Sequence, residues 1–140
     1  GVDARFKIVS DGKLVATVPR RAESGPIVVS SALKQVRSRT SFRILPRAAR
    51  APRVFGVARI GHRLRATTGT WLGDSPTSYS FAWLACNARG RACTPVQGAT
   101  RRTLELGPSR LGERYRVLVT VRNGSGTGSA RSAASPIVTR

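Results

Sequence analysis

The fold is decided by the stretch Ser78-Tyr79-Ser80-Phe81-Ala82-Trp83-Leu84, in which an aromatic residue occupies every second position. Successive side chains of a β-strand point to opposite faces, so Tyr79, Phe81 and Trp83 are expected on the same face. A row of aromatics on one face predicts the floor of a hydrophobic core. We expect Trp83 at its centre.

A second segment, from Tyr115 to Arg122, alternates in the same way. One side of this strand carries apolar residues, namely Tyr115, Val117, Val119 and Val121, and the other carries Arg116, Thr120 and Arg122. This pattern is typical of a central antiparallel strand with one face buried and one in water.

Short β-prone runs continue on both sides of these two strands. They are Val54 to Val57, Arg63 to Thr68, Thr103 to Leu106 and Ala130 to Val138, with Gly, Pro, Ser or Asn between them. Strands at this spacing with no helix of useful length predict an all-β sandwich and exclude a parallel α/β fold.

The first third of the chain has the same character. Its β-prone runs are Phe6 to Ile8, Lys13 to Val18, Ile27 to Val29 and Ser41 to Leu45, while Ser30 to Thr40 reads as a polar connection that includes a weak helical window at Ser31 to Arg37. Prolines at 46 and 52 bracket a stretch that should be extended and semi-stiff. We therefore divide the chain into a first segment, residues 1–46, a linker, residues 47–52, and a β-sandwich domain, residues 53–140.

Two resemblances refine this division. Leu14-Val15-Ala16-Thr17-Val18-Pro19, Ser24-Gly25-Pro26-Ile27-Val28-Val29 and Thr40-Ser41-Phe42-Arg43-Ile44 resemble the second half of an IPT/TIG domain, although Ala32-Leu33-Lys34-Gln35 replaces the usual Gly-Gly hairpin. That resemblance implies a partial immunoglobulin-like segment before the sandwich.

Residues 52–140 resemble an immunoglobulin-like repeat of secreted actinobacterial proteins. The matching motifs are Gly61-His62-Arg63-Leu64, Gly69-Thr70-Trp71, Ser78 to Trp83 with Cys86, Cys93-Thr94-Pro95, Gly98-Ala99-Thr100, Leu111-Gly112-Glu113 and Val119 to Asn123. Neither family implies catalysis. Both imply a spacer or adhesive module of a modular extracellular protein.

Charge is the most unusual property of the composition. Twenty-five Lys and Arg residues against six Asp and Glu residues give a formal net charge of +19. Such a surplus attracts polyanions. Arg-rich composition is also what a GC-rich genome produces, but this does not explain the scarcity of acids, so both interpretations stay open.

Five arginines alternate with core residues and should point outward. They are the possible polyanion contacts: Arg63, Arg65, Arg114, Arg116 and Arg122. The two strands that carry them should lie in opposite sheets, which spreads the charge around the module. Without interleaved exposed aromatics, specific nucleic-acid binding is not expected.

Cys86 and Cys93 flank a turn-rich hexapeptide that follows a strand. A disulfide across this loop would contribute about 2.5 kcal/mol in the chain-entropy model. A metal pair would lack ligands, since only the distant His62 could join it, and a redox pair prefers two intervening residues. We expect the disulfide, and with it an oxidising compartment outside the cytosol.

No residue set predicts an enzyme, a cofactor or a metal. His62 has no catalytic partners in the sequence, the loop from Asn123 to Gly128 is expected to be a flexible hairpin followed by a strand and not a phosphate loop, and Trp71 is expected to pack.

The sequence therefore favours a non-catalytic structural or adhesion module of a secreted or cell-surface bacterial protein, with an unidentified protein or glycan partner and no membrane span in this segment. The alternatives are a basic module that anchors to cell-wall polymers, acidic glycans or nucleic acid, and an accessory domain of a secreted hydrolase.

Overall fold

Thirteen β-strands and one 3₁₀ turn form the secondary structure of the computed structural model, which describes residues 1–140. The first-segment strands are β1 (Phe6–Ser10), β2 (Lys13–Ala16), β3 (Gly25–Ser30) and β4 (Gln35–Phe42). The others are β5 (Arg47–Arg50), β6 (Val54–Phe55), β7 (Arg63–Ala66), β8 (Thr70–Leu72), β9 (Ser78–Cys86), β10 (Thr94–Pro95), β11 (Thr103–Glu105), β12 (Arg114–Asn123) and β13 (Gly126–Arg131), with the 3₁₀ turn η1 at Pro108–Arg110.

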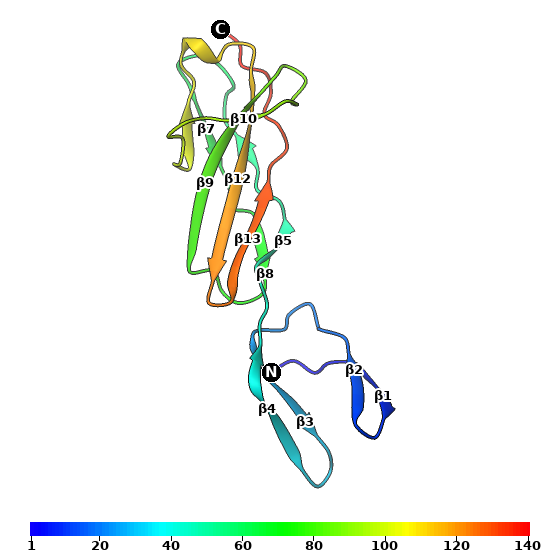
Figure 1. Cartoon of the computed structure of the whole chain (residues 1–140). Coiled ribbons are helices and arrows are strands. Elements are labelled where there is room, and N and C mark those ends of the chain that lie inside the picture. The colour runs from blue at the N-terminus through cyan, green and yellow to red at the C-terminus, as the bar shows by residue number, and fades with distance from the viewer.

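Two sheets face each other in the second part of the chain. One has the strand order β10-β9-β12-β13 and the other the order β11-β7-β6, and all pairings between these strands are antiparallel. Figure 1 shows them as an elongated body with the C-terminus at one end. The structure is thus all-β, and this part is a β-sandwich of the immunoglobulin-like class.

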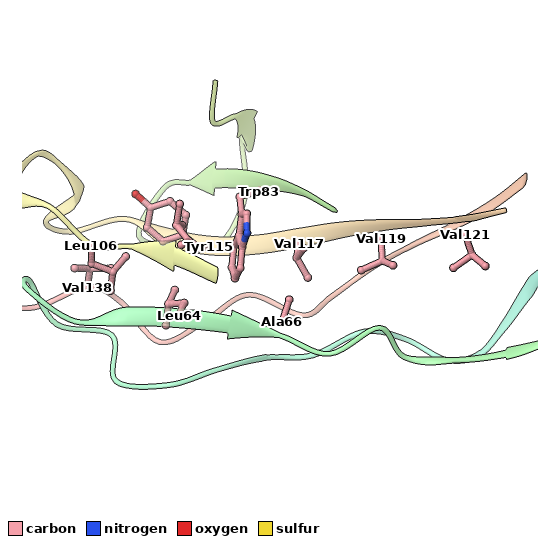
Figure 2. Close-up of a cluster of buried hydrophobic side chains, with 10 residues drawn as sticks. Leu64, Ala66, Trp83, Leu106, Tyr115, Val117, Val119, Val121 and Val138 are labelled. Atoms are coloured by element: carbon pink, nitrogen blue, oxygen red, sulfur yellow. The ribbon is translucent and has the colours of Figure 1, made fainter. Parts of the chain in front are cut away.

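The core lies between these two sheets. Trp83 from β9 and the inward residues of β12 contact Leu64 and Ala66 from β7 (Figure 2). Trp83, Tyr115, Val117, Val119 and Val121 are all completely buried. The indole Nε1 of Trp83 donates a hydrogen bond to the carbonyl of Arg101 at 2.9 Å, which satisfies its polar group inside the core.

The aromatic row of β9 is only partly buried. Phe81 is half-buried and Tyr79 is 42% exposed, so the expectation that Tyr79 belongs to the core was wrong. Tyr79 is exposed because the strands next to β9 and opposite it are short. Strand β10 pairs only with Ala85 and Leu84, which leaves the edge of β9 open beside Tyr79, and the opposing strand β7 has only four residues.

The last strand is displaced from its expected position. β13 spans Gly126–Arg131, and the chain beyond it is not a strand as far as Val138. In this segment, two serine hydroxyls accept hydrogen bonds from backbone N–H groups of β12. Ser132 Oγ accepts one from the N–H of Val117, and Ser135 Oγ accepts one from the N–H of Tyr115, both at 2.9 Å. Because the hydroxyls accept these hydrogen bonds, the chain can leave the sheet while the buried N–H groups of β12 keep a partner.

The stretch expected to be a linker is a strand. Residues 47–50 form β5, which pairs antiparallel with β8 through Arg47 and Leu72 and through Ala48 and Trp71. The flanking Pro46 and Pro52 are both buried and lie outside the paired residues, where a missing N–H costs no ladder hydrogen bond. Trp71 is half-buried and donates to the carbonyl of Thr68 at 2.8 Å.

The first segment consists of two separate hairpins, β1-β2 and β3-β4, which extend from one end of the sandwich (Figure 1). β4 runs through Gln35–Phe42, where the sequence suggested a polar connection or a short helix, because pairing with β3 in the register Val29 with Val36 outweighs the helical spacing. Both hairpins are exposed, and most of their large apolar side chains face solvent, including Phe6, Ile8 and Phe42.

We predict that Trp83→Ala lowers the free energy of unfolding of the sandwich by about 3 to 5 kcal/mol, because it removes the largest buried side chain and leaves a cavity. Tyr79→Ala on the same strand is the control and should cost about 1 kcal/mol. Urea unfolding followed by circular dichroism measures both. Equal losses would contradict the placement of the core.

Candidate functional site

The structure contains no cluster of His, Cys, Asp and Glu side chains that could hold a metal ion, and both cysteines are disulfide-bonded. His62 lies exposed in a turn before β7. Two open depressions lie on the surface, one near Gln97, Arg101 and Arg110 and another near Arg59 and Leu111. No helix has the length and apolar character needed to cross a bilayer.

The disulfide joins Cys86 at the end of β9 to Cys93, as the sequence predicted. The loop between them is ordered by Asn87, whose Oδ1 accepts hydrogen bonds from the backbone N–H groups of Arg89 and Arg91 at 3.1 and 3.0 Å. Ala92 adopts a positive φ of 49°, which turns the chain back so that β10 can pair with β9. The disulfide closes a turn that the Asn87 hydrogen bonds also hold.

Two arginines on the outer face of β12 hold this disulfide loop in place. Arg114 donates from Nε to the carbonyl of Ala88 at 2.7 Å and from Nη1 to that of Ser135 at 2.9 Å. Arg116 donates to the carbonyl of Gly90 from Nε at 3.3 Å and from Nη2 at 3.1 Å, and to that of Ser132 from Nη1 at 3.0 Å. Each guanidinium thus ties the loop to the segment that follows β13. We call these two side chains the arginine clamps.

The five arginines expected to contact polyanions therefore divide into different roles. All five lie on the outer faces of two opposite sheets, but the guanidiniums of Arg114 and Arg116 are engaged by backbone carbonyls. Arg63 forms an exposed ion pair with Glu105 at 3.4 Å, which contributes little to stability. Arg65 and Arg122 have no side-chain partner. The alternating sequence pattern predicted that these five arginine side chains point outward. It did not predict which groups they contact.

The three acidic residues of the sandwich are all engaged by protein groups. Glu105 pairs with Arg63, and Glu113 accepts a hydrogen bond from the hydroxyl of Tyr115. Burial, assisted by this hydrogen bond, raises the pKa of Tyr115 to about 12, so the phenol stays protonated and remains a donor. Arg110 lies over the Tyr115 ring, 5.5 Å from its centroid. The third acid, Asp74, lies at the other end of the body.

Asp74 organises a polar junction between the first segment and the sandwich. Its Oδ1 accepts a hydrogen bond from the backbone N–H of Ser24 at 2.6 Å, and its Oδ2 accepts one from the hydroxyl of Ser125 at 2.9 Å. The two serine hydroxyls lie 2.8 Å apart, and Ser24 Oγ also accepts from the N–H of Ile44 at 2.7 Å. These contacts connect the first segment, the β8–β9 loop and the β12–β13 turn.

The β12–β13 turn is built to present Ser125 to this junction. Asn123 is buried, and its Oδ1 accepts hydrogen bonds from the backbone N–H groups of Ser125 and Gly126 at 2.8 and 3.0 Å. Its Nδ2 donates to the carbonyl of Ile44 at 3.2 Å. The sequence predicted a flexible hairpin here. An Asn followed by Gly, Ser and Gly was the available signal for such a side-chain-stabilised turn.

Hydrogen bonds from Ser24 and then Ser125 hold the pKa of Asp74 below its ordinary value of 3.8 and outweigh the opposing effect of partial burial. The carboxylate is therefore charged at neutral pH. Because its folded-state pKa is depressed, its contribution is complete above the ordinary value and is lost as the pH falls through the lower, folded-state value.

Comparison of the chain with protein-family models, with curated proteins and with solved structures gives no match.

We predict that Arg116→Ala lowers the free energy of unfolding by about 1 to 2 kcal/mol, because three hydrogen bonds from a half-buried guanidinium are lost. Arg122→Ala lies on the same face of the same strand, has no side-chain partner to lose, and should change stability by less than about 0.5 kcal/mol. Thermal unfolding of both variants measures the difference. If the two variants were equally stable, the clamp would have no energetic role.

The Ser24 amide should report the ionisation of Asp74. In an NMR titration, we expect its proton shift to change with a midpoint below 3.8, the ordinary value for this carboxyl, and to be constant between pH 5 and 8. Asp74→Asn should abolish the titration. A midpoint above 3.8, or a Ser24 amide that does not respond, would show that the junction does not form as described.

Proposed function

We propose that this chain is a non-catalytic structural or adhesion module of a secreted or cell-surface modular protein. The observation that supports this most directly is the path of the chain, which enters the sandwich at one end and leaves it at the other (Figure 1). Such a path suits a module that holds its neighbours apart.

The two ends of the body differ in their contacts. Asn123, at the end of β12, lies at the junction with the first segment, through Ile44. Val138, near the C-terminus, packs with Leu106 at the opposite end of the core (Figure 2). Strand β12 runs between these ends, and its ten residues span about 30 Å. A tensile load applied through the two ends is therefore directed along the strands and is opposed by their hydrogen-bond ladders.

The Cys86–Cys93 disulfide supports the extracellular part of the proposal. Disulfides persist in oxidising compartments and are rare in the cytosol. The resemblance of the sequence to an IPT/TIG half-domain and to an actinobacterial immunoglobulin-like repeat points the same way. An accessory domain of a secreted hydrolase would use the same geometry to position a neighbouring catalytic domain.

Single-molecule stretching tests the load-bearing role. With the chain pulled from its two termini, we expect the first segment to extend at low force, because its hairpins bury almost nothing, and the sandwich to rupture in one distinct event at higher force. Adding a reductant should lengthen that event by about 20 Å, since the seven-residue separation within the disulfide loop becomes extensible.

A sandwich that extended without a force peak would rule out a mechanical role. A second measurement addresses the compartment: thiol titration of protein isolated from its own cells should find no free cysteine. Free thiols in such protein would remove the strongest support for an extracellular location.

A further inference from the structure

The outer face of the four-stranded sheet carries a regular grid of residues whose polar side chains form no hydrogen bond or ion pair within the protein. The strand register aligns β9, β12 and β13 in three cross-strand rows. The rows are Ser78-Arg122-Thr127, Ser80-Thr120-Ser129 and Ala82-Leu118-Arg131. We call these nine residues the hydroxyl–arginine face. They point outward because their neighbours on β12 fill the core.

The polar groups of this face have no partners in the protein. None of its five hydroxyls and neither of its guanidiniums is hydrogen-bonded or ion-paired, and six of the seven polar side chains are exposed, with Thr120 half-buried. No acidic residue belongs to the face. The arginine clamps, by contrast, lie beyond its edge on β12 and are engaged by carbonyls. The surface thus carries two unpaired positive charges among unpaired hydroxyls.

From this arrangement, we infer that the hydroxyl–arginine face binds a linear anionic glycan, a carbohydrate chain that bears sulfate or phosphate groups. Arg122 and Arg131 lie four residues apart along the strands and one strand apart across them, about 14 Å from each other. They would contact two anionic groups of one chain. The hydroxyls of Ser80, Thr120 and Ser129 lie between them, where they can exchange hydrogen bonds with sugar hydroxyls.

The spacing of the cations argues against nucleic acid as the ligand. A DNA duplex carries one charge for about every 1.7 Å of its axis, so two arginines about 14 Å apart neutralise very little of it. The face also has no aromatic side chain on which a base could stack. A protein partner fits poorly too, because the face lacks the large aromatic and apolar anchors that dominate protein interfaces.

Binding of the full chain to an immobilised sulfated glycosaminoglycan oligosaccharide tests the inference. Arg122→Ala combined with Arg131→Ala should weaken binding about tenfold at low salt, through the loss of two ion pairs. The dependence of log affinity on log salt should become shallower, because the double variant has two fewer cations to displace counterions from the glycan. The matched control is Arg63→Ala combined with Arg65→Ala, which removes the same charge from the opposite sheet and should change affinity by less than about twofold.

Equal losses in the two double variants would overturn the inference, because they would mean that the net charge alone attracts the glycan. A second pair, Ser80→Ala with Ser129→Ala, should weaken binding by about threefold without altering the salt slope, through lost hydrogen bonds. Unchanged affinity in this pair would contradict the part assigned to the hydroxyls. Tighter binding of a short DNA duplex than of the glycan at equal salt, with the same dependence on Arg122 and Arg131, would also reject the glycan as ligand.

Discussion

The sandwich depends on the contact between Trp83 and the inward valines of β12. Both strands are long, nine and ten residues, whereas the strands of the opposing sheet have two to four. One extended pair, β9 with β12, therefore supplies most of the buried surface, and the shorter strands cover it. Successive side chains of a strand point to opposite faces. Burial of Val117 and Val119 in the core therefore places their neighbours in β12 on the outer face of the sheet. Core and outer face are specified together.

The electrostatics follow from the same constraint. Arginines displaced to the outer faces meet only three acids in the sandwich, so most must find other partners or none. Arg114 and Arg116 donate hydrogen bonds to backbone carbonyls of the disulfide loop and of the segment after β13. These two arginines therefore connect the loop to that segment. Arg122 and Arg131 remain free on a surface of hydroxyls. A single alternating pattern thus yields both clamps and a candidate binding surface.

The sequence was sufficient for features that depend on local spacing: the all-β class, the burial of Trp83 and of alternate residues in β12, and the Cys86–Cys93 pair. It failed where distant segments decide the outcome. β5 is a strand because β8 lies beside it, and Ser132 and Ser135 replace ladder acceptors only because β12 presents free N–H groups there. The Asp74 junction joins residues 50 and 51 positions apart, which no periodicity can show.

The arginine clamps and the Asp74 junction respond differently to acid. The arginine clamps join guanidiniums to backbone carbonyls and involve no carboxylate. The attachment at Asp74 relies on a carboxylate and weakens once that group takes up a proton. Protonation of Asp74 would consequently weaken the attachment between the first segment and the sandwich, while the contacts of Asn123 with Ile44 and of Ser24 with Ser125 would remain.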